Sequence, residues 1–354
     1  MRYQRKLNWY LLGPTLILMG LSLFHLYALS GDDSLNYFYR QLTWIAAGLI
    51  CLFIIYLLPT LIWPKLTYVA YGIIALLLML VLIKAEPTYG AKRWLEIGWI
   101  SFQPSEFAKI VLIGTLAKLT STHKEINWKI IFLSLLMTSF LALLVVTQPD
   151  LGTGLILVSL WLVIIFVSGI SLKKFLVIIG AMIAVFPLSY FFLLRPYQKL
   201  RILTFLNPQR DPLGAGWSSL QSKIALGSGR LFGKGIGGAA HTQLKYLPQP
   251  FTDFIFSSVG EAWGFVGTSI IIILYGLITI QGINLALKKG KSFGGIFAAG
   301  FTALIGLQGF INMGMASGML PVTGVPLPLI SYGGSSALLF LSGIGILLAF
   351  YREL

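Results

Sequence analysis

The sequence predicts an all-α protein that crosses a membrane about ten times, as one domain over residues 1–354. Hydrophobic residues make up 57% of the chain and charged residues only 10%, and the mean hydropathy is +0.86. Soluble domains carry about 25% charged residues, so this composition excludes an ordinary water-soluble fold. The single cysteine, Cys51, cannot form an internal disulfide, so helix packing must hold the fold together.

Apolar stretches of about 20 residues mark the expected spans, because that length crosses a hydrocarbon core of about 30 Å. The first stretch is longer than the apolar region of a cleavable signal peptide, and further spans follow it. A long polar loop, approximately residues 195–252, separates the seventh span from the eighth. The ten predicted spans are 9–29, 41–58, 66–83, 104–119, 128–146, 151–167, 174–194, 254–281, 293–316 and 331–351.

The distribution of Lys and Arg predicts the orientation, because short cytoplasmic loops collect these residues. The rule is satisfied when both termini are cytoplasmic, which makes the 195–252 loop extracytoplasmic. In that orientation the cytoplasmic segments contain Arg2, Arg5, Lys6, Lys65, Lys118, Lys124, Lys129, Lys173, Lys174, Lys288, Lys289, Lys291 and Arg352.

The 195–252 loop is strongly basic, with Asp211 as its only acid. Long loops escape the positive-inside rule, so this excess needs another reason. Attraction to anionic lipid headgroups and docking of a polyanionic substrate such as a lipid pyrophosphate are both open. Its glycines could present amides to phosphate or simply allow tight turns. Its cations are Arg195, Lys199, Arg201, Arg210, Lys223, Arg230, Lys234 and Lys245.

Asp253 lies where this polar loop enters the eighth apolar stretch. A carboxylate at such a boundary is poorly hydrated, so we expect it to be paired or to titrate near neutral pH, and both states suit chemistry. Glu261 follows eight residues later, roughly 12 Å along a helix. Paired glycosidase carboxylates lie at about 5–9.5 Å, so a two-carboxylate site is not expected. Glu261 is expected to pair with a cation on a neighbouring span, with Lys109 a candidate.

Further charges lie at membrane depth or at its edge. Glu106 and Lys109 are three residues apart and share one helical face, so they predict either an internal ion pair or a functional cavity. Asp150 precedes the sixth span and is expected to cap that helix. The hydroxyls of the 331–336 segment, including Ser331, are expected to cap the tenth helix or to allow close packing.

Several classes of function are disfavoured. His25, His123 and His241 have no metal-binding spacing, and with one cysteine a zinc site is not expected. No histidine base accompanies the serines of the 331–336 segment, which argues against a serine hydrolase. No basic and aromatic platform is present, so no nucleic acid partner is expected.

Five ordered motifs resemble those of the SEDS family of cell-wall proteins, and they extend over nearly the whole chain. The short N-terminal tail, residues 39–41 and the Val-Thr-Gly-Val-Pro form of the last motif resemble the elongation branch, RodA, more than the division branch, FtsW. The motifs are Phe-Gln-Pro-Ser-Glu-Phe-Ala-Lys at 102–109, Thr-Gln-Pro-Asp-Leu-Gly at 147–152, Thr-Asp-Phe-Ile-Phe at 252–256, Asn-Met-Gly-Met at 312–315, and the segment 321–336.

The resemblance implies a peptidoglycan glycosyltransferase that polymerises lipid II in the bacterial plasma membrane. Asp253 matches the family's essential aspartate, a general base that one carboxylate can provide because pyrophosphate is a good leaving group. The resemblance places six further residues at the cavity or its support, namely Glu106, Lys109, Asp150, Glu261, Asn312 and Ser331. It also implies a class B penicillin-binding protein and other elongation-complex membrane proteins as partners.

The chain departs from the family at Gln249, Phe251 and Ala262, where the family often has Glu, His and a second Glu. These changes leave the aspartate in place. They argue against mechanisms that need the family's usual Glu, His and second Glu beside it. No resident metal is expected, although Mg²⁺ or Mn²⁺ could accompany the pyrophosphate. Two alternatives remain open: a lipid II flippase, which fits ten spans with internal charges, and a non-catalytic scaffold, which leaves Asp253 unexplained.

Overall fold

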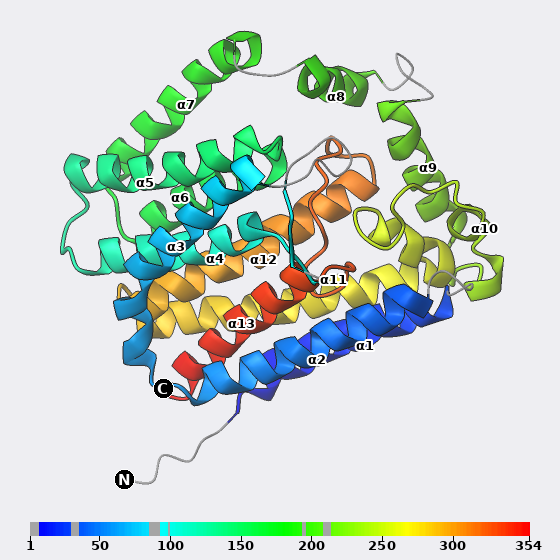
Figure 1. The fold of residues 1–354 in the computed structure, drawn as a ribbon, viewed down its shortest axis with the longest axis horizontal. Coiled ribbons are helices and arrows are strands. Elements are labelled where there is room, and N and C mark those ends of the chain that lie inside the picture. The colour runs from blue at the N-terminus through cyan, green and yellow to red at the C-terminus, as the bar shows by residue number, and fades with distance from the viewer. Residues whose placement is uncertain (1–6, 30–34, 85–92, 98–99, 193–195, 208–213) are drawn as a thin grey trace. The chain divides into compact units, whose positions relative to one another are not determined.

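The computed structural model describes residues 7–29, 35–84, 93–97, 100–192, 196–207 and 214–354. This part is almost entirely helical (Figure 1), and its strands form one antiparallel hairpin, β1 (Leu95–Ile97) with β2 (Ile100–Phe102). Each predicted span coincides with a helix, which confirms the all-α prediction. The helices are α1 (Trp9–Ala28), α2 (Leu35–Leu57), α3 (Trp63–Lys84), α4 (Pro104–Ser121), α5 (Trp128–Thr147), α6 (Leu151–Val167), α7 (Leu172–Phe192), α11 (Ile255–Lys289), α12 (Phe293–Ala316) and α13 (Gly334–Tyr351).

Seven of these helices are long and apolar enough to cross a membrane within the part of the chain described, namely α1, α2, α3, α5, α11, α12 and α13. Helix α6 is equally apolar in character but shorter. Helix α4 carries Glu106, Lys109 and Lys118, and these three charged side chains lower its mean hydropathy.

The chain forms two compact units. The first consists of Met1–Gly169, Ile272–Gly309 and Pro328–Leu354, and the second of Ile170–Ile271 and Phe310–Leu327. Helices α11 and α12 therefore contribute residues to both units.

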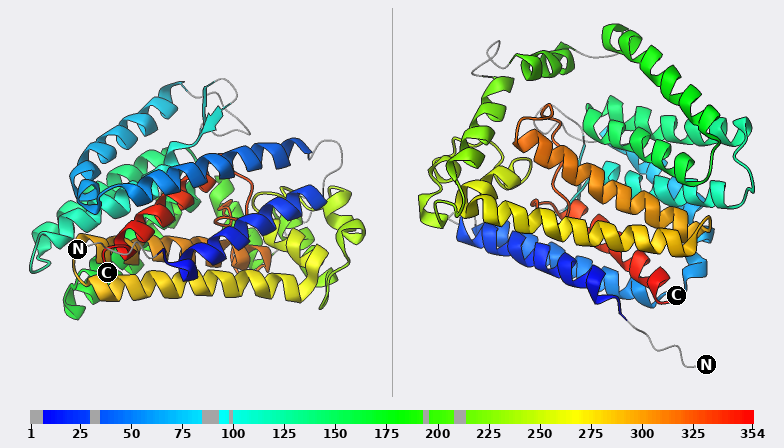
Figure 2. Two further views of the ribbon diagram at one scale, coloured as in Figure 1. Left: turned by 90° about the horizontal axis from the view of Figure 1, so that it is seen from below. Right: turned by 180° about the vertical axis from the view of Figure 1, so that it is seen from behind.

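In the first unit, polar side chains fix where the helices begin. The side chains of Asn8 and Asn127 accept hydrogen bonds from the second or third amide of α1 and α5, respectively. Pro104 begins α4, where its missing N–H costs nothing. Helices α5 and α6 pack side by side (Figures 1 and 2), and the Trp161 indole N–H donates to Ser134 Oγ at 2.9 Å between them.

Helix α13 packs against α2 at close range. A Cβ on Gly48 would lie 2.4 Å from Leu341 Cδ1, and one on Gly345 would lie 2.9 Å from the Leu52 carbonyl oxygen. Small residues allow such close approach in the absence of a hydrophobic driving force between helices in lipid. The apolar interior of the first unit is therefore built on backbone proximity rather than on large side chains alone.

In the second unit, the segment predicted as a polar loop is largely helical. It contains α8 (Pro196–Leu206), α9 (Ala215–Ser228), the 3₁₀ turn η3 (Ile236–Gly238) and α10 (Ala240–Gln243). These helices are short or only partly apolar, so a search for membrane-length stretches does not detect them. Arg195, Arg210 and Asp211 of this segment lie outside the described residues, as do Arg2, Arg5 and Lys6.

Candidate active site

The Asp253 turn, residues 249–254, leads directly into α11. The Gln249 carbonyl accepts hydrogen bonds from the amides of Thr252 at 3.3 Å and Phe254 at 3.2 Å. The Thr252 hydroxyl also donates to Gln249 Oε1 at 3.3 Å. Gln249, a departure from the family pattern, thus closes the turn that presents the aspartate, and its neutral amide is sufficient for that role.

Asn312, near the end of α12, connects this turn to the 317–327 segment. It is fully buried, and its Nδ2 donates to the Asp253 carbonyl at 2.8 Å and to the Val325 carbonyl at 2.9 Å. Buried carbonyls need such partners, so Asn312 fixes the turn from behind. It is a positioning residue, because its hydrogen bond reaches the Asp253 backbone and leaves the carboxylate to other partners.

The Asp253 carboxylate lies against Gly324, in the middle of the Val-Thr-Gly-Val-Pro segment. A Cβ built on Gly324 would lie 3.5 Å from Asp253 Oδ2, and Gly324 has φ 74°, a conformation that favours glycine. The Asp253 residue is half-buried. Two family motifs far apart in sequence therefore meet at the predicted base.

An apolar cluster supports the site. It consists of Ala225, Leu247, Phe254 and Met315, with Val322 packed against it. Hydrogen bonds reinforce this cluster: Ser222 Oγ donates to the Ala316 carbonyl at 2.8 Å and lies 2.7 Å from Ser257 Oγ. Helices α9, α11 and α12 are thereby joined beneath the Asp253 turn.

Glu261 is fully buried, and the amides of α10 hold its carboxylate. It accepts from the amides of His241 and Thr242 at 3.0 Å each and from the Thr242 hydroxyl at 2.8 Å. Lys234 Nζ lies 3.6 Å from Oε1. Glu261 does have a cation partner, but the expected place of that cation on a neighbouring span is wrong, because Lys234 lies in the 195–252 segment. The candidate Lys109 is also wrong, because Lys109 pairs with Glu106 on its own helix.

The α9–α10 connection is joined to α11 at a break in that helix. Gly264 has the non-helical angles φ 67° and ψ −161°, so the surrounding main-chain groups need other partners. The strap, defined as residues 229–235, supplies them. Lys234 N and Gly235 N donate to the carbonyls of residues 261 and 262, while the amides of residues 265 and 266 donate to the carbonyls of Arg230 and Leu231, all at 2.8–3.1 Å.

In the first unit, Lys109 donates to Glu106 Oε1 at 2.7 Å and to Gln308 Oε1 at 2.9 Å. All three side chains are buried. The predicted internal ion pair is confirmed, and it connects α4 to α12 through Gln308. Sequence reasoning missed Gln308, because an uncharged amide inside an apolar helix gives no charge signal.

Asp150 caps α6, as expected. Its carboxylate accepts from the Thr153 amide at 3.1 Å and from the Thr153 hydroxyl at 2.9 Å. Beside it, Arg93 donates to the carbonyls of Gln148, at 3.2 Å, and Pro149. The carboxylate thus serves the local fold of the Thr-Gln-Pro-Asp motif.

Ser331 is buried, and its carbonyl accepts from Gln41 Nε2 at 3.4 Å. The expectation that serines of this segment cap the tenth helix is wrong, because the N-cap of α13 is Gly333, which has no side chain. The alternative of close packing fits better, since Ser335 Oγ instead accepts from the Gln103 amide at 3.0 Å.

The predicted site residues thus fall into two groups. Asp253, Asn312 and Glu261 belong to the second unit, where the first two are joined directly. The remaining members, Glu106, Lys109, Asp150 and Ser331, belong to the first unit. Within the described residues, no group of three or more His, Cys, Asp or Glu side chains is placed to hold a metal ion.

The apolar helices define a multi-pass membrane protein, and it contains a buried ion pair and a half-buried aspartate. The chain belongs to the FtsW/RodA/SpoVE family of cell cycle proteins, the SEDS family, whose model matches residues 5–354. It is 37% identical over 350 residues to the peptidoglycan glycosyltransferase MrdB of Escherichia coli, covering 97% of this chain and 94% of the relative.

Solved structures agree with this assignment. A chain from a structure described as "Structural coordination of polymerization and crosslinking by a peptidoglycan synthase complex" is similar with a TM-score of 0.85 and 33% identity, covering 98% of both chains. The crystal structure of the rod shape determining protein RodA of Thermus thermophilus gives a TM-score of 0.74 at 31% identity, covering 98% of this chain and 97% of the other. The resemblance found in the sequence is thereby confirmed.

Proposed function

We propose that this chain is a peptidoglycan glycosyltransferase that polymerises lipid II at the outer face of the bacterial plasma membrane during cell elongation. The observation that carries the mechanism is the placement of Asp253, a half-buried carboxylate held by a turn that Asn312 fixes and Gly324 adjoins. The name of the Escherichia coli relative supports the reaction class.

Asp253 acts as the general base. It accepts the proton of the C4 hydroxyl on the acceptor's GlcNAc, and that oxygen forms a bond to the anomeric carbon of the terminal MurNAc of the growing chain. The bond from this carbon to the phosphate oxygen breaks, and undecaprenyl pyrophosphate leaves with inversion. General base catalysis typically contributes about 10²–10⁴-fold, so the base is one part of the rate enhancement beside positioning of the two lipids.

The other predicted site residues support this base without touching the reacting bond. Asn312 fixes the position of the Asp253 turn through its hydrogen bonds to the Asp253 and Val325 carbonyls. Glu261 is engaged by the amides of α10 and by Lys234, so it organises the α9–α10 connection. Glu106 and Lys109 neutralise each other and hold α4 against α12.

A divalent cation has no ligand set of its own in the described residues. Mg²⁺ commonly binds through substrate phosphates and retains several waters, so Mg²⁺ or Mn²⁺ would be held mainly by the pyrophosphate oxygens.

The charge pattern supports cytoplasmic termini and an Asp253 turn on the outer side. The similar chain in the peptidoglycan synthase complex supports a partner that crosslinks the strands. The class B penicillin-binding protein is that partner, and other elongation-complex membrane proteins would dock on apolar outer faces of the spans.

The test uses purified protein and lipid II in detergent, where no two compartments exist. Wild type should make glycan strands, which would reject both the flippase and the scaffold. Asp253→Asn should lose at least about 10²-fold in rate while keeping the wild-type Tm and elution volume. A folded D253N variant that polymerises at nearly the wild-type rate would contradict the base assignment.

A further inference from the structure

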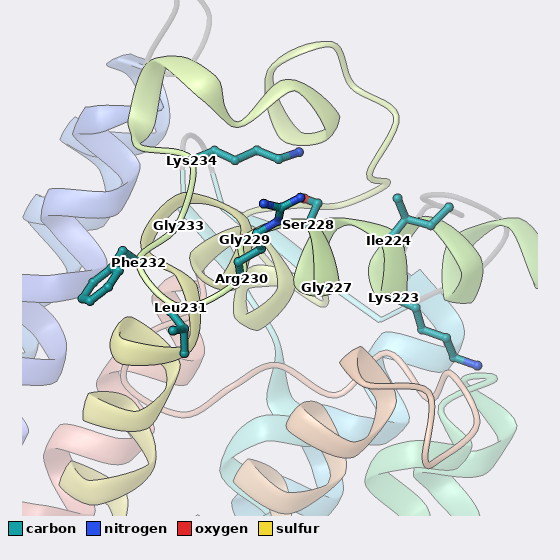
Figure 3. A pocket seen from close by; sticks show the side chains of 10 residues that line it. All are labelled: Lys223, Ile224, Gly227, Ser228, Gly229, Arg230, Leu231, Phe232, Gly233 and Lys234. Carbon is teal, nitrogen blue, oxygen red and sulfur yellow. The ribbon is translucent and has the colours of Figure 1, made fainter.

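An open cavity of about 950 Å³ lies beside the strap, lined by Lys223, Ile224 and residues 227–234. Its lining combines the cations Lys223, Arg230 and Lys234 with the apolar residues Ile224, Leu231 and Phe232, and contains no acid among the described residues. Figure 3 shows the Arg230 and Lys234 side chains extending toward the same region beside Ser228, while the Phe232 ring points the other way. The strap is therefore amphipathic.

The strap is held rigidly enough to form a site. Besides its four main-chain hydrogen bonds to α11, two of its glycines lie directly on that helix. A Cβ on Gly229 would lie 1.8 Å from the Gly260 carbonyl oxygen, and one on Gly233 would lie 2.2 Å from the Ala262 carbonyl oxygen. No side chain fits in either place, so the strap cannot lift without losing these contacts.

The length of α11 places the strap at the membrane boundary. The part of α11 from Phe265 to the lysines at its end extends about 35 Å at 1.5 Å per residue, against a hydrocarbon core of about 30 Å. With Lys288 and Lys289 at one surface, the break at Gly264 lies at the other. Val266 and Ile270 expose 42% and 44% of their surface on this helix, and Leu231 and Phe232 of the strap expose 61% and 81%. The strap thus continues the lipid-facing surface of α11.

Leu231 and Phe232 form the apolar tip of the strap, and the positive charges beside this tip could bind an anion. Arg230 forms no ion pair within the described residues and is exposed. Lys234 lies 3.6 Å from Glu261, whose oxygens already accept three hydrogen bonds from α10. Apolar side chains that enter a bilayer beside Arg and Lys at headgroup level are the pattern of an interfacial anchor for anionic lipid.

We propose that the strap and its cavity form a binding site for an anionic phospholipid of the bilayer, such as phosphatidylglycerol. Arg230 and Lys234 contact the phosphate, and Leu231 and Phe232 enter the acyl region. In the proposed orientation this lipid belongs to the outer leaflet. The site is separate from the chemistry assigned to Asp253 and would exist even if that assignment failed.

The direct test follows lipid binding by fluorescence. The variant F232W adds a tryptophan at the apolar tip, and its extra emission over wild type should be quenched by brominated phosphatidylglycerol in mixed micelles more than by brominated phosphatidylcholine. Adding R230Q should lower the affinity for phosphatidylglycerol, measured by this quenching, roughly fivefold, which is the effect of removing one surface cation. The matched control K245Q, which removes an exposed cation of the same loop, should leave the response unchanged.

Three results would overturn the proposal. Equal quenching by the two lipids would remove the charge preference, and equal losses in R230Q and K245Q would indicate diffuse attraction without a site. The third concerns the substrate, which also carries phosphate. If R230Q raised the KM for lipid II several-fold in detergent without phospholipid, the cavity would bind the substrate instead. To guard against a fold defect of F232W, the rise in Tm on adding phosphatidylglycerol to wild type and to R230Q provides a second readout.

Discussion

At the scale of single residues, Lys109 is a full charge at an almost completely buried position, neutralised by Glu106. Lys109→Met should therefore destabilise the protein by about 3–5 kcal/mol, because it leaves a buried carboxylate without its cation. The double variant E106Q/K109M should recover most of this loss, since no charge then remains. Thermal unfolding of the purified variants in detergent measures both. A double variant as unstable as K109M would show that the ion pair is not the source of the effect.

Asn312 gives a prediction that separates positioning from stability. Asn312→Ala leaves the carbonyls of Asp253 and Val325 without their shared donor, at a cost of about 1–3 kcal/mol for each buried group. Because the Asp253 turn then loses its fixed direction, kcat for polymerisation should fall about tenfold or more, with a smaller change in KM. Kinetics with lipid II in detergent check the split.

The neighbouring variant M313A is the matched control, since Met313 is on the same helix and, unlike Asn312, has no side-chain amide to donate to the Asp253 turn. It should retain kcat within about twofold, because the hydrogen bonds from Asn312 to the Asp253 and Val325 carbonyls remain. A purely structural role of Asn312 would instead lower the Tm and the amount of active enzyme while leaving kcat per folded molecule unchanged.

At the scale of elements, the break in α11 depends on Gly264. A Cβ there would lie 2.3 Å from the Gly233 amide nitrogen, and the φ of 67° disfavours any L side chain. Gly264→Ala should separate the strap from α11 and lower the Tm. Gly276→Ala is the control on the same helix, where a Cβ would meet no described atom within 4 Å, and it should be neutral or slightly stabilising because alanine favours helix.

The contrast between these glycines shows what sequence reasoning could predict about the elements. The positions of the ten predicted helices followed from apolar stretches, and within the described residues seven of those helices are long and apolar enough to cross the hydrocarbon core. The break at Gly264 could not be predicted, because its main-chain groups are satisfied by the strap some thirty residues earlier, a pairing without any pattern of hydrophobicity. The helices within 195–252 were missed for a related reason, since their packing partners are not visible in local composition.

The site was predictable to a similar degree. Asp253 and Asn312 were identified from motifs in the sequence, and the structure joins them by the hydrogen bond from Asn312 Nδ2 to the Asp253 carbonyl. The predicted pairing of Glu261 with Lys109 was wrong. Counting charges along the spans cannot show that the backbone amides of a four-residue helix bind the Glu261 carboxylate. Gly324 was part of the Val-Thr-Gly-Val-Pro motif, but only the fold shows that this motif lies against the Asp253 carboxylate.

At the scale of the whole molecule, the orientation in the membrane can be tested with the chain's own chemistry. Cys51 is the only cysteine, and its Sγ lies 3.3 Å from Ser342 Oγ, an arrangement that Cys51→Ser preserves. A cysteine-free protein should therefore fold and polymerise normally. Single cysteines can then be introduced at two exposed lysines, Lys245 in the loop before Asp253 and Lys124 between α4 and α5.

With the Asp253 turn outside, K245C should react in intact cells with a maleimide that cannot cross the membrane, and K124C should react only after the membrane is opened. The reason is that short loops rich in Lys and Arg stay on the cytoplasmic side, whereas the long basic segment is free of that rule. Labelling of K124C but not K245C in intact cells would invert the topology and place Asp253 on the side where the proposed polymerisation cannot occur. The reaction of both sites after permeabilisation confirms that each cysteine is accessible, so the comparison depends on the membrane alone.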